Sequence, residues 1–281
     1  MNKNRNLKEQ VLESTLKFQF ENQDYESARE HPTYYRALNR EPRTTHPFNI
    51  YTDILRQPEL VRLALDELGE PVLEMAAEMN HRSIRRVLFS GVGCSYHVGA
   101  AAAHAFWRLA GIPAEYVQSA EALAAGQVFD LDGTLVVGLS ASGNTLETVQ
   151  HLQAARAAGA YTLACVNLDQ TRLTDAAHAS LVAPGGYGLV WDYPTRLAIV
   201  TLLALEFGRN RGRGQADLDT VQVELKKLPE IMEAVLARSD QRCMQFGREL
   251  STAQAVLLPT TGGQMPNAWE IALRFEEMAH I

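Results

Sequence analysis

Four hydroxyl side chains and a glycine lie within nine residues in the middle of the chain, directly after the apolar run Thr134–Val137. The segment reads Gly138-Leu139-Ser140-Ala141-Ser142-Gly143-Asn144-Thr145-Leu146-Glu147-Thr148. This pattern predicts a buried strand, a turn and a helix, whose first N–H groups carry the positive end of the helix dipole. Glycine lets the backbone approach a ligand closely. We therefore expect residues 140–145, which we name the hydroxyl loop, to bind an anion such as a phosphate ester.

A structural interpretation of the same residues stays open. Ser140 or Ser142 would then only cap the helix, with Thr145 and Thr148 in its first turn. A cap needs one hydroxyl, whereas this segment offers four around one glycine. The ligand-binding interpretation is therefore favoured.

Short apolar strands alternate with helices on both sides of the hydroxyl loop. We expect strands at Val87–Ser90, Glu115–Gln118, Leu135–Leu139, Tyr161–Val166 and Leu181–Ala183. We expect helices at Ser95–Leu109, Ala120–Ala125, Thr145–Ala158, Pro194–Phe207, Leu218–Ala237 and Asn267–Ile281. This alternation is typical of a parallel sheet that is covered on both faces. Ligands of such folds bind at the carboxyl ends of the strands, where the hydroxyl loop falls.

A second polar turn, Gly91-Val92-Gly93-Cys94-Ser95-Tyr96, follows the first expected strand. A dinucleotide-binding fingerprint would need a third glycine at position 96 and an acid at the end of the next strand. The third glycine is Gly99 and Glu115 lies at the start of that strand, so a nicotinamide enzyme is disfavoured. Contacts from Cys94 and Ser95 to a sugar hydroxyl or phosphate are better supported. No histidine is expected to pair with Cys94, so Cys94 is not expected to be a nucleophile, and a small buried residue remains the alternative.

The segments outside this alternation give weaker signals. A short helix over Phe48–Pro58 is expected to end near Pro58. Helical spacing over Leu60–Met79 is broken at Gly69 and Pro71. Asp192 is a candidate cap of the helix that follows it, and Trp191 a candidate pocket rim.

Composition limits the function classes. The 281 residues are 46% hydrophobic and 21% charged, which indicates one large or two modest globular domains. A net charge of −7 argues against a general nucleic-acid binder. The widely spaced Cys94, Cys165 and Cys243 lack metal-ligand spacing and suggest reduced thiols in the cytoplasm. We expect no membrane span and no secretory leader, because the required apolar segments are missing.

A repeated pattern lies near the end of the chain. Val256–Gly263 has the same order of apolar, hydroxyl and glycine residues as Val87–Cys94, and an alanine-bearing helix follows each. We therefore expect a strand at Val256–Leu258 and the start of a second α/β unit, as in a piece of a longer protein. The expected organisation is a polar arm over 1–47 with a helix at Asn6–Phe20, a first domain over 48–210, and a linker helix with the second unit over 211–281.

These motifs resemble those of a known family. Ser140-Ala141-Ser142-Gly143-Asn144-Thr145-x-Glu147-Thr148 resembles the Ser-x-Ser-Gly-x-Thr-x-Glu/Asp-Thr signature of sugar isomerase (SIS) domains. Gly93-Cys94-Ser95-Tyr96 is similar to the Gly-Thr-Ser-Tyr turn of double-SIS proteins such as the isomerase half of glucosamine-6-phosphate synthase. Ala268–Glu277 is similar to the Ala-Leu-Glu-Gly-Ala-Leu-Lys-Leu-Lys-Glu segment that opens the second SIS domain there.

The resemblance implies a three-layer α/β/α, flavodoxin-like domain with a five-stranded parallel sheet that binds phosphosugars. Position by position, it implies substrate contacts from Cys94, Ser95, Ser140, Ala141, Ser142, Gly143, Asn144, Thr145 and Val190. It implies that Glu277 is the base that moves a proton between C1 and C2 through an enediol, a role that suits a carboxylate. It also implies a cytoplasmic homodimer whose sites are completed across subunits, without a metal or organic cofactor.

The sequence departs from the family's pattern at two positions, and several activities stay open. Arg274 stands where the family has a lysine; it keeps the charge but cannot form a Schiff base. Asp192 replaces a small hydroxyl residue. The resemblance leaves three activities open: an aldose–ketose isomerase, an aminosugar-phosphate deaminase and a deglycase of phosphorylated ketosamines. The alternatives are a regulatory phosphosugar-sensing module and a chain that binds phosphosugar without activity; from spacing alone, Glu277 and its neighbours are solvated helix charges.

Overall fold

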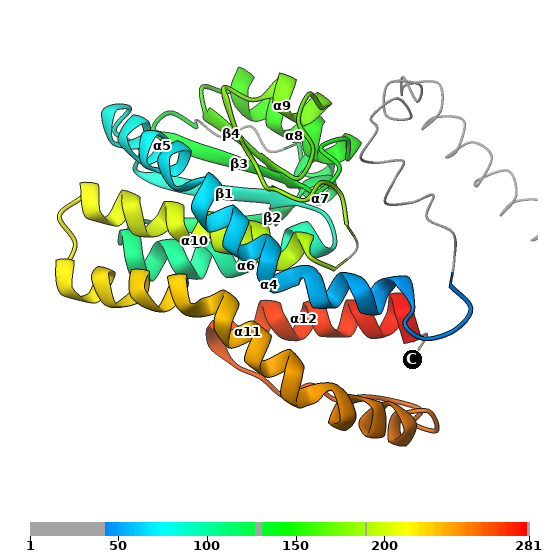
Figure 1. Ribbon diagram of the computed structural model, residues 1–281. Coiled ribbons are helices and arrows are strands. Elements are labelled where there is room, and N and C mark those ends of the chain that lie inside the picture. Colours follow the sequence, from blue (N-terminus) through cyan, green and yellow to red (C-terminus); the bar gives the residue numbers. More distant parts are fainter. Residues whose placement is uncertain (1–42, 127–130, 189, 280–281) are drawn as a thin grey trace, which may run out of the picture. The chain divides into compact units, whose positions relative to one another are not determined.

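A five-stranded parallel sheet organises the described part of the chain, residues 43–126, 131–188 and 190–279 of this computed structural model (Figure 1). Its strands are β1 (Arg86–Gly91), β2 (Ala114–Gln118), β3 (Thr134–Ser140), β4 (Tyr161–Val166) and β5 (Ala179–Val182). The order across the sheet is β2-β1-β3-β4-β5, and every neighbouring pair is parallel. The prediction of a five-stranded parallel sheet is confirmed. The helix expected at Asn6–Phe20 lies outside the described residues.

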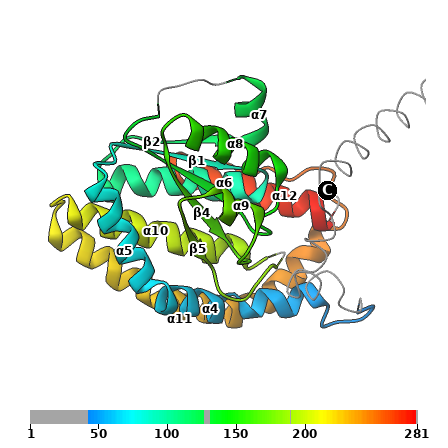
Figure 2. The same cartoon turned by 90° about the horizontal axis from the view of Figure 1, so that it is seen from above.

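Helices cover both faces of the sheet, which explains why β3 is apolar along its length. All seven residues of β3 are buried. Leu135, Val137 and Leu139 pack in a core that includes residues of α5 (Gly69–His81), α6 (Cys94–Ala105) and α10 (Asp192–Asn210). Val136 points the other way, into a core with α8 (Leu146–Ala157) and α9 (Arg172–Ala176). Alternate residues of one strand thus serve the two outer layers, and Figure 2 shows these layers from above.

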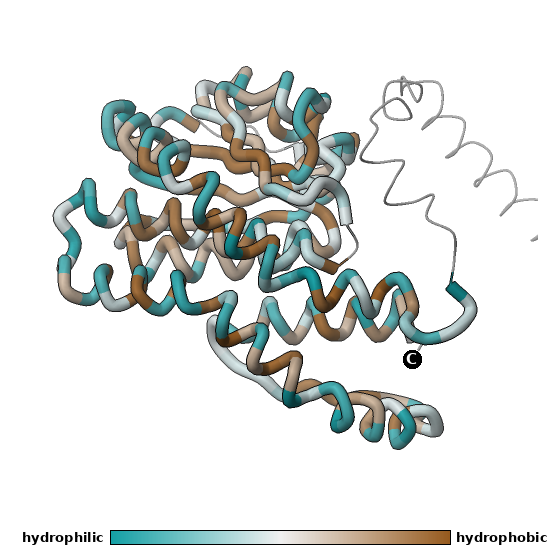
Figure 3. The backbone as a smooth tube through the Cα atoms, viewed as in Figure 1, coloured by the Kyte–Doolittle hydropathy of each residue, from teal (hydrophilic) through white to brown (hydrophobic). Residues whose placement is uncertain are grey.

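The remaining elements flank these layers. A short helix α7 (Ser119–Ala124) follows β2, and π-helix η1 (Phe106–Ala110) continues α6. The long α11 (Gln215–Leu250) packs against α4 (Asn49–Glu67). The described chain ends with η2 (Gly262–Gln264), α12 (Met265–Arg274) and η3 (Phe275–Ala279), and α12 packs on α6. Figure 3 shows hydrophobic residues along the central strands and a mixture of both kinds along α11.

Two helices continue through proline: α4 does so against expectation, whereas the helix expected at Leu218–Ala237 already included Pro229. Pro58 lies inside α4 and does not end it, and α11 passes Pro229 and extends well beyond Ala237. A proline inside a helix removes one backbone hydrogen bond and crowds the preceding turn. Both prolines are buried, and α4 packs against α10 and α11, so tertiary packing offsets that cost. The break expected near Gly69 is confirmed, since α4 ends at Glu67 and α5 begins at Gly69.

The strand expected at Val256–Leu258 does not form. Residues 255–261 have no regular secondary structure, and Leu257 is 89% exposed. A strand needs a neighbour for its backbone N–H and C=O groups, and within the described residues no strand pairs with this segment. The turn and helix of the repeated pattern do form, as η2 and α12. The second α/β unit and the domain boundaries at 47/48 and 210/211 stay predictions.

Candidate functional site

Two polar turns meet at the carboxyl edge of the sheet. The hydroxyl loop follows β3, and the turn that holds Cys94 and Ser95 follows β1. These strands are neighbours, with Ser90 opposite Gly138. The placement of both turns at one edge is as predicted from the alternation of strands and helices.

Three hydroxyls converge within the hydroxyl loop. The Ser140 Oγ lies 2.9 Å from the Thr145 Oγ1 and 3.4 Å from the Ser142 Oγ. The Gly143 N–H donates to the Ser140 Oγ at 3.1 Å, and the Asn144 N–H donates to the Ser142 Oγ at 3.2 Å. The loop backbone therefore holds the hydroxyls together as a cluster of neutral donors and acceptors.

The start of α8 completes this cluster. Thr145 is the residue before the helix, and its side chain makes no capping hydrogen bond. The first N–H groups of a helix have no partner inside it and carry the positive end of the dipole. The loop hydroxyls thus lie beside an uncapped helix start, which is an arrangement suited to an anion and not the simple helix cap of the structural interpretation.

Thr148, the fourth hydroxyl of the motif, does not belong to this cluster. It is fully buried, and its Oγ1 lies 3.1 Å from the Ser119 Oγ. The Ser119 Oγ in turn lies 2.8 Å from the Ser90 Oγ, which is 2.7 Å from the His151 Nδ1. Burial lowers the pKa of His151. This buried network joins β1 to α7 and α8 beneath the hydroxyl loop.

Gly143 fixes the shape of the hydroxyl loop. Its φ is +66°, a conformation that side chains rarely adopt, and a Cβ there would overlap the Thr171 side chain. The Gly143 carbonyl accepts the Leu173 N–H at 2.9 Å. The loop is therefore packed closely against the start of α9, and a glycine is needed at this position.

A buried arginine organises the second turn. Arg196 of α10 has no exposed surface and donates from Nη1 to the Ser95 Oγ at 2.7 Å. Its Nη2 lies 3.7 Å from the Cys94 Sγ and 3.3 Å from the Asp192 Oδ2. Sequence reasoning did not single out Arg196. The available signal was one arginine within the apolar stretch Pro194–Phe207, where a charge must be paired if it is buried.

Asp192 pairs with Arg196 and does not cap α10. The residue before α10 is Trp191, and no side chain caps that end of the helix. Burial raises the pKa of Asp192, and the charge of Arg196 opposes this rise. Burial, with the nearby Asp192, also raises the pKa of Cys94 well above its ordinary value. Cys94 is therefore a thiol at neutral pH, in agreement with the expectation that it is not a nucleophile.

Val190 and Trp191 lie in the buried segment that leads into α10. The Val190 carbonyl, expected to contact the sugar, accepts the Gln57 side-chain amide at 2.9 Å. The Trp191 indole donates to the Gly186 carbonyl at 3.2 Å, and its side chain is buried. Trp191 thus packs into the preceding loop and is not an exposed rim.

The contacts of Glu277 do not involve the hydroxyl loop. Glu277 belongs to η3, its side chain is 49% exposed, and its Oε2 lies 2.9 Å from the Arg274 Nη1. Within the described residues, no hydrogen bond joins Glu277 to the hydroxyl loop. The structure therefore brings together the expected ligands from the two turns and leaves the expected base on the last helical segment.

Helix α12 is docked on α6 by a hydrogen bond between Glu270 and His97. The Glu270 Oε2 lies 2.9 Å from the His97 Nδ1, and the Glu270 Oε1 accepts the Arg274 Nε at 2.7 Å. Burial acts to raise the pKa of Glu270, but the hydrogen bond from His97 and the charge of Arg274 outweigh it and hold that pKa below its ordinary value. Trp269 also stacks on Tyr96 with ring centroids 6.0 Å apart. These contacts fix the helix that precedes Glu277.

Comparison with known proteins identifies the fold around these turns. The sequence profile of the SIS domain matches residues 82–205. This chain contains a SIS domain. It is 26% identical over 250 residues to the glutamine–fructose-6-phosphate aminotransferase [isomerizing] of Thermococcus kodakarensis, covering 87% of this chain and 41% of that protein. It is 30% identical over 240 residues to the Corynebacterium glutamicum enzyme of the same name, covering 82% and 38%. The chain thus spans about two fifths of these curated relatives.

Solved structures show the same SIS fold. The C-terminal domain of glucosamine-fructose-6-phosphate aminotransferase from Francisella tularensis superposes with a TM-score of 0.75 and 18% identity, covering 86% of this chain and 70% of that one. Tagatose-6-phosphate ketose/aldose isomerase from Escherichia coli gives a TM-score of 0.63 and 17% identity, covering 85% and 66%. The resemblance stated from the sequence motifs is confirmed at the level of domain and fold.

The described residues offer neither a cluster of metal ligands nor a membrane-spanning helix. Their His, Cys, Asp and Glu side chains form no group of three or more that could hold a metal ion. Every helix in the described ranges is too short or too polar to cross a bilayer.

Proposed function

We propose that the SIS domain binds the phosphate of a sugar phosphate at the hydroxyl loop. The observation that carries this proposal is the convergence of the Ser140, Ser142 and Thr145 hydroxyls beside the uncapped start of α8. Hydroxyls and backbone N–H groups suit a dianionic phosphate because they donate hydrogen bonds to its oxygens although they carry no charge themselves. Ala141, Gly143 and Asn144 would contribute backbone contacts, and Cys94 and Ser95 would face the sugar from the neighbouring turn.

The proposed reaction is a proton transfer between C1 and C2 of the bound sugar. The Glu277 carboxylate takes the proton from the hydroxyl-bearing carbon beside the carbonyl, the C–H electrons form the C=C bond of an enediol, and the carbonyl oxygen gains a proton from solvent. Glu277 then returns its proton to the former carbonyl carbon, while the other enediol hydroxyl releases its proton to solvent and becomes the new carbonyl. Arg274, which lies 2.9 Å from the Glu277 carboxylate, would orient it. Support comes from the names of the similar proteins, which include an isomerizing aminotransferase and a ketose/aldose isomerase.

The choice between isomerase, deaminase and deglycase depends on the amino group of the substrate. An isomerase needs only the proton transfer, whereas the other two must also expel an amine. A homodimer with a shared site and a cytoplasmic location belong to the same proposal. The cytoplasmic location is consistent with Cys94, Cys165 and Cys243 being free thiols.

A phosphosugar-sensing module is the second candidate. The observation that favours it is the exposure of Glu277, whose carboxylate pairs, among the described residues, with Arg274 only. Such a module would need the hydroxyl loop but not a base. Under this alternative, phosphosugar binds with the same residues and no product forms.

A thermal-shift screen tests the proposed function. The chain is mixed with hexose phosphates, amino-sugar phosphates and fructosyl-amino-acid phosphates, with the unphosphorylated sugars as matched controls. We expect a rise in melting temperature that requires the phosphate, because a ligand that binds only the folded state stabilises it. Product analysis on the best ligand separates the enzyme from the sensor. Equal shifts with phosphorylated and unphosphorylated sugars would contradict the proposed phosphate contact.

A further inference from the structure

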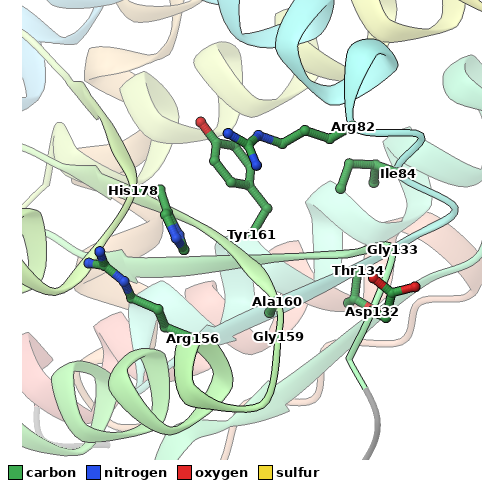
Figure 4. Close-up of a pocket in the computed structure, with 10 residues that line it drawn as sticks. All are labelled: Arg82, Ile84, Asp132, Gly133, Thr134, Arg156, Gly159, Ala160, Tyr161 and His178. Atoms are coloured by element: carbon green, nitrogen blue, oxygen red, sulfur yellow. The ribbon is translucent and has the colours of Figure 1, made fainter.

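A second polar cavity lies at the opposite, amino edge of the sheet, where β3 and β4 begin (Figure 4). Its volume is about 230 Å³. Its walls come from the end of α5, the turn before β3, the last turn of α8, the start of β4 and the residue before β5. A strand rises about 3.3 Å per residue, so the length of β3 places this cavity roughly 20 Å from the hydroxyl loop. It is a separate site.

The charged groups around this cavity are predominantly positive. Arg82 and Arg156 line it, and arginine keeps its charge at any physiological pH. One carboxylate, Asp132, also lines the cavity and lies 3.6 Å from Arg85, and Glu78 lies 2.5 Å from the Arg82 Nε, so each of these carboxylates faces an arginine. The charge of Arg156 has no carboxylate partner among the described residues. An anion is therefore the favoured ligand.

Both lining arginines are held in place. The Arg82 guanidinium lies over the Tyr161 ring, 4.2 Å from its centroid. The Arg156 Nη1 donates to the carbonyls of Ala176 and Ala177, each at 3.3 Å. Figure 4 shows Arg82 and Arg156 on different sides of the Tyr161 and His178 rings. Two oriented guanidinium groups from separate walls lower the entropy cost of binding an anion between them.

His178 adds a neutral donor between the arginines. Its Nδ1 accepts the Thr162 N–H at 3.1 Å, so the ring proton lies on Nε2. Burial, with the charges of Arg156 and Arg82, lowers the pKa of His178, which favours the neutral ring. The His178 ring also stacks on Tyr161 with centroids 5.1 Å apart. The cavity thus presents N–H donors from three separate segments.

We infer that this cavity is a second anion site that binds a small phosphate group, held by Arg82, Arg156 and the Nε2–H of His178. Donors from three walls match an anion with three terminal oxygens better than a planar carboxylate. The phosphate group has two sources, inorganic phosphate and a small phosphate monoester. The inference does not rest on the proposed function of the hydroxyl loop.

NMR of the intact chain tests this inference. Inorganic phosphate and glycerol 2-phosphate are titrated separately, with sodium chloride at matched ionic strength as the control for screening. We expect saturable shifts of the Gly133 and Gly159 amides and of the His178 imidazole with either phosphate but not with chloride. Arg156→Gln and Arg82→Gln should each weaken this binding about tenfold or more. The matched control is Arg238→Gln, since Arg238 is exposed on α11 and donates to the Ala234 carbonyl of its own helix.

The outcomes separate the two sites and the two sources. If only glycerol 2-phosphate saturates the shifts, the ligand is an ester; if inorganic phosphate suffices, the cavity recognises the free ion. The shifts should persist in Ser142→Phe, which blocks only the hydroxyl loop. If Arg156→Gln fails to fold, Arg82→Gln tests the inference from the other wall of the cavity. Unchanged affinity in the arginine variants, or shifts confined to the hydroxyl loop, would overturn the inference.

Discussion

The hydroxyl loop and the η3 segment supply the binding group and the chemical group of the proposed site, but they are built differently. Ser140 is almost fully buried, and its hydroxyl is held by a backbone N–H and two neighbouring hydroxyls. The Glu277 side chain is 49% exposed and pairs with Arg274. The fold therefore preorganises the proposed phosphate site, whereas it leaves the proposed base adjustable. Binding and turnover should respond to different mutations.

Replacing Ser142 with a large side chain should have the largest effect. Ser142→Phe fills the space between the loop hydroxyls, so we expect complete loss of sugar-phosphate binding in calorimetry. The control is Ser251→Phe, because Ser251 is exposed at the end of α11. If a folded Ser142→Phe chain binds the sugar phosphate as tightly as the original chain, the hydroxyl loop is not the phosphate site.

At Glu277 we expect the opposite result, a loss of turnover without a loss of binding. Glu277→Gln removes the base and keeps the shape, so turnover should fall about 10²- to 10⁴-fold while phosphosugar affinity stays the same. The neighbouring exposed residue gives the control Glu276→Gln, which should retain activity. A parallel fall in binding and turnover would show that the two parts of the site do not act separately.

Variants of Arg196 test how strongly this buried arginine stabilises the turn that holds Cys94 and Ser95. Arg196→Met leaves Asp192 buried without its partner, and breaking a buried ion pair costs about 3–5 kcal/mol of unfolding free energy. Denaturant unfolding measures this loss. The double variant Arg196→Met/Asp192→Asn should recover much of it, because no unpaired charge remains. A single variant as stable as the original chain would contradict the proposed role of Arg196 in holding Ser95.

The smallest expected effect is a pH dependence from Glu270, which docks the helix that leads to Glu277. Its pKa lies below the ordinary value of 4.5, so its ionised form stabilises the fold above that pH, and the stabilisation is lost as pH falls through the folded-state pKa. Unfolding curves of the original chain and Glu270→Gln should therefore converge as pH falls below 4.5. A stability difference that does not depend on pH would assign Glu270 a packing role only.

The sheet was predictable from sequence because its signal is local. A strand buried on both faces needs an unbroken apolar run, and Leu135–Leu139 supplies one before the hydroxyl loop. Parallel strands then place both polar turns at one edge without knowledge of side-chain contacts. The location of the candidate site follows from this local pattern.

The parts that sequence reasoning missed depend on distant partners. Nothing local shows that Arg196 meets Ser95, about a hundred residues earlier, or that Thr148 faces Ser119 and not the hydroxyl loop. Pro58 continues a helix because α4 is buried against α10 and α11. The apolar run at Val256–Leu258 could not show whether a neighbouring strand was present to pair with it.

NMR of the hydroxyl loop tests the central claim most directly. Amide spectra of the chain are recorded with fructose 6-phosphate, glucosamine 6-phosphate and the two unphosphorylated sugars. We expect large, saturable shifts of the Gly143 and Asn144 amides and of the first turn of α8 with at least one phosphorylated ligand and none with its unphosphorylated counterpart. Phosphate-dependent shifts elsewhere in the chain, with these amides unmoved, would contradict it.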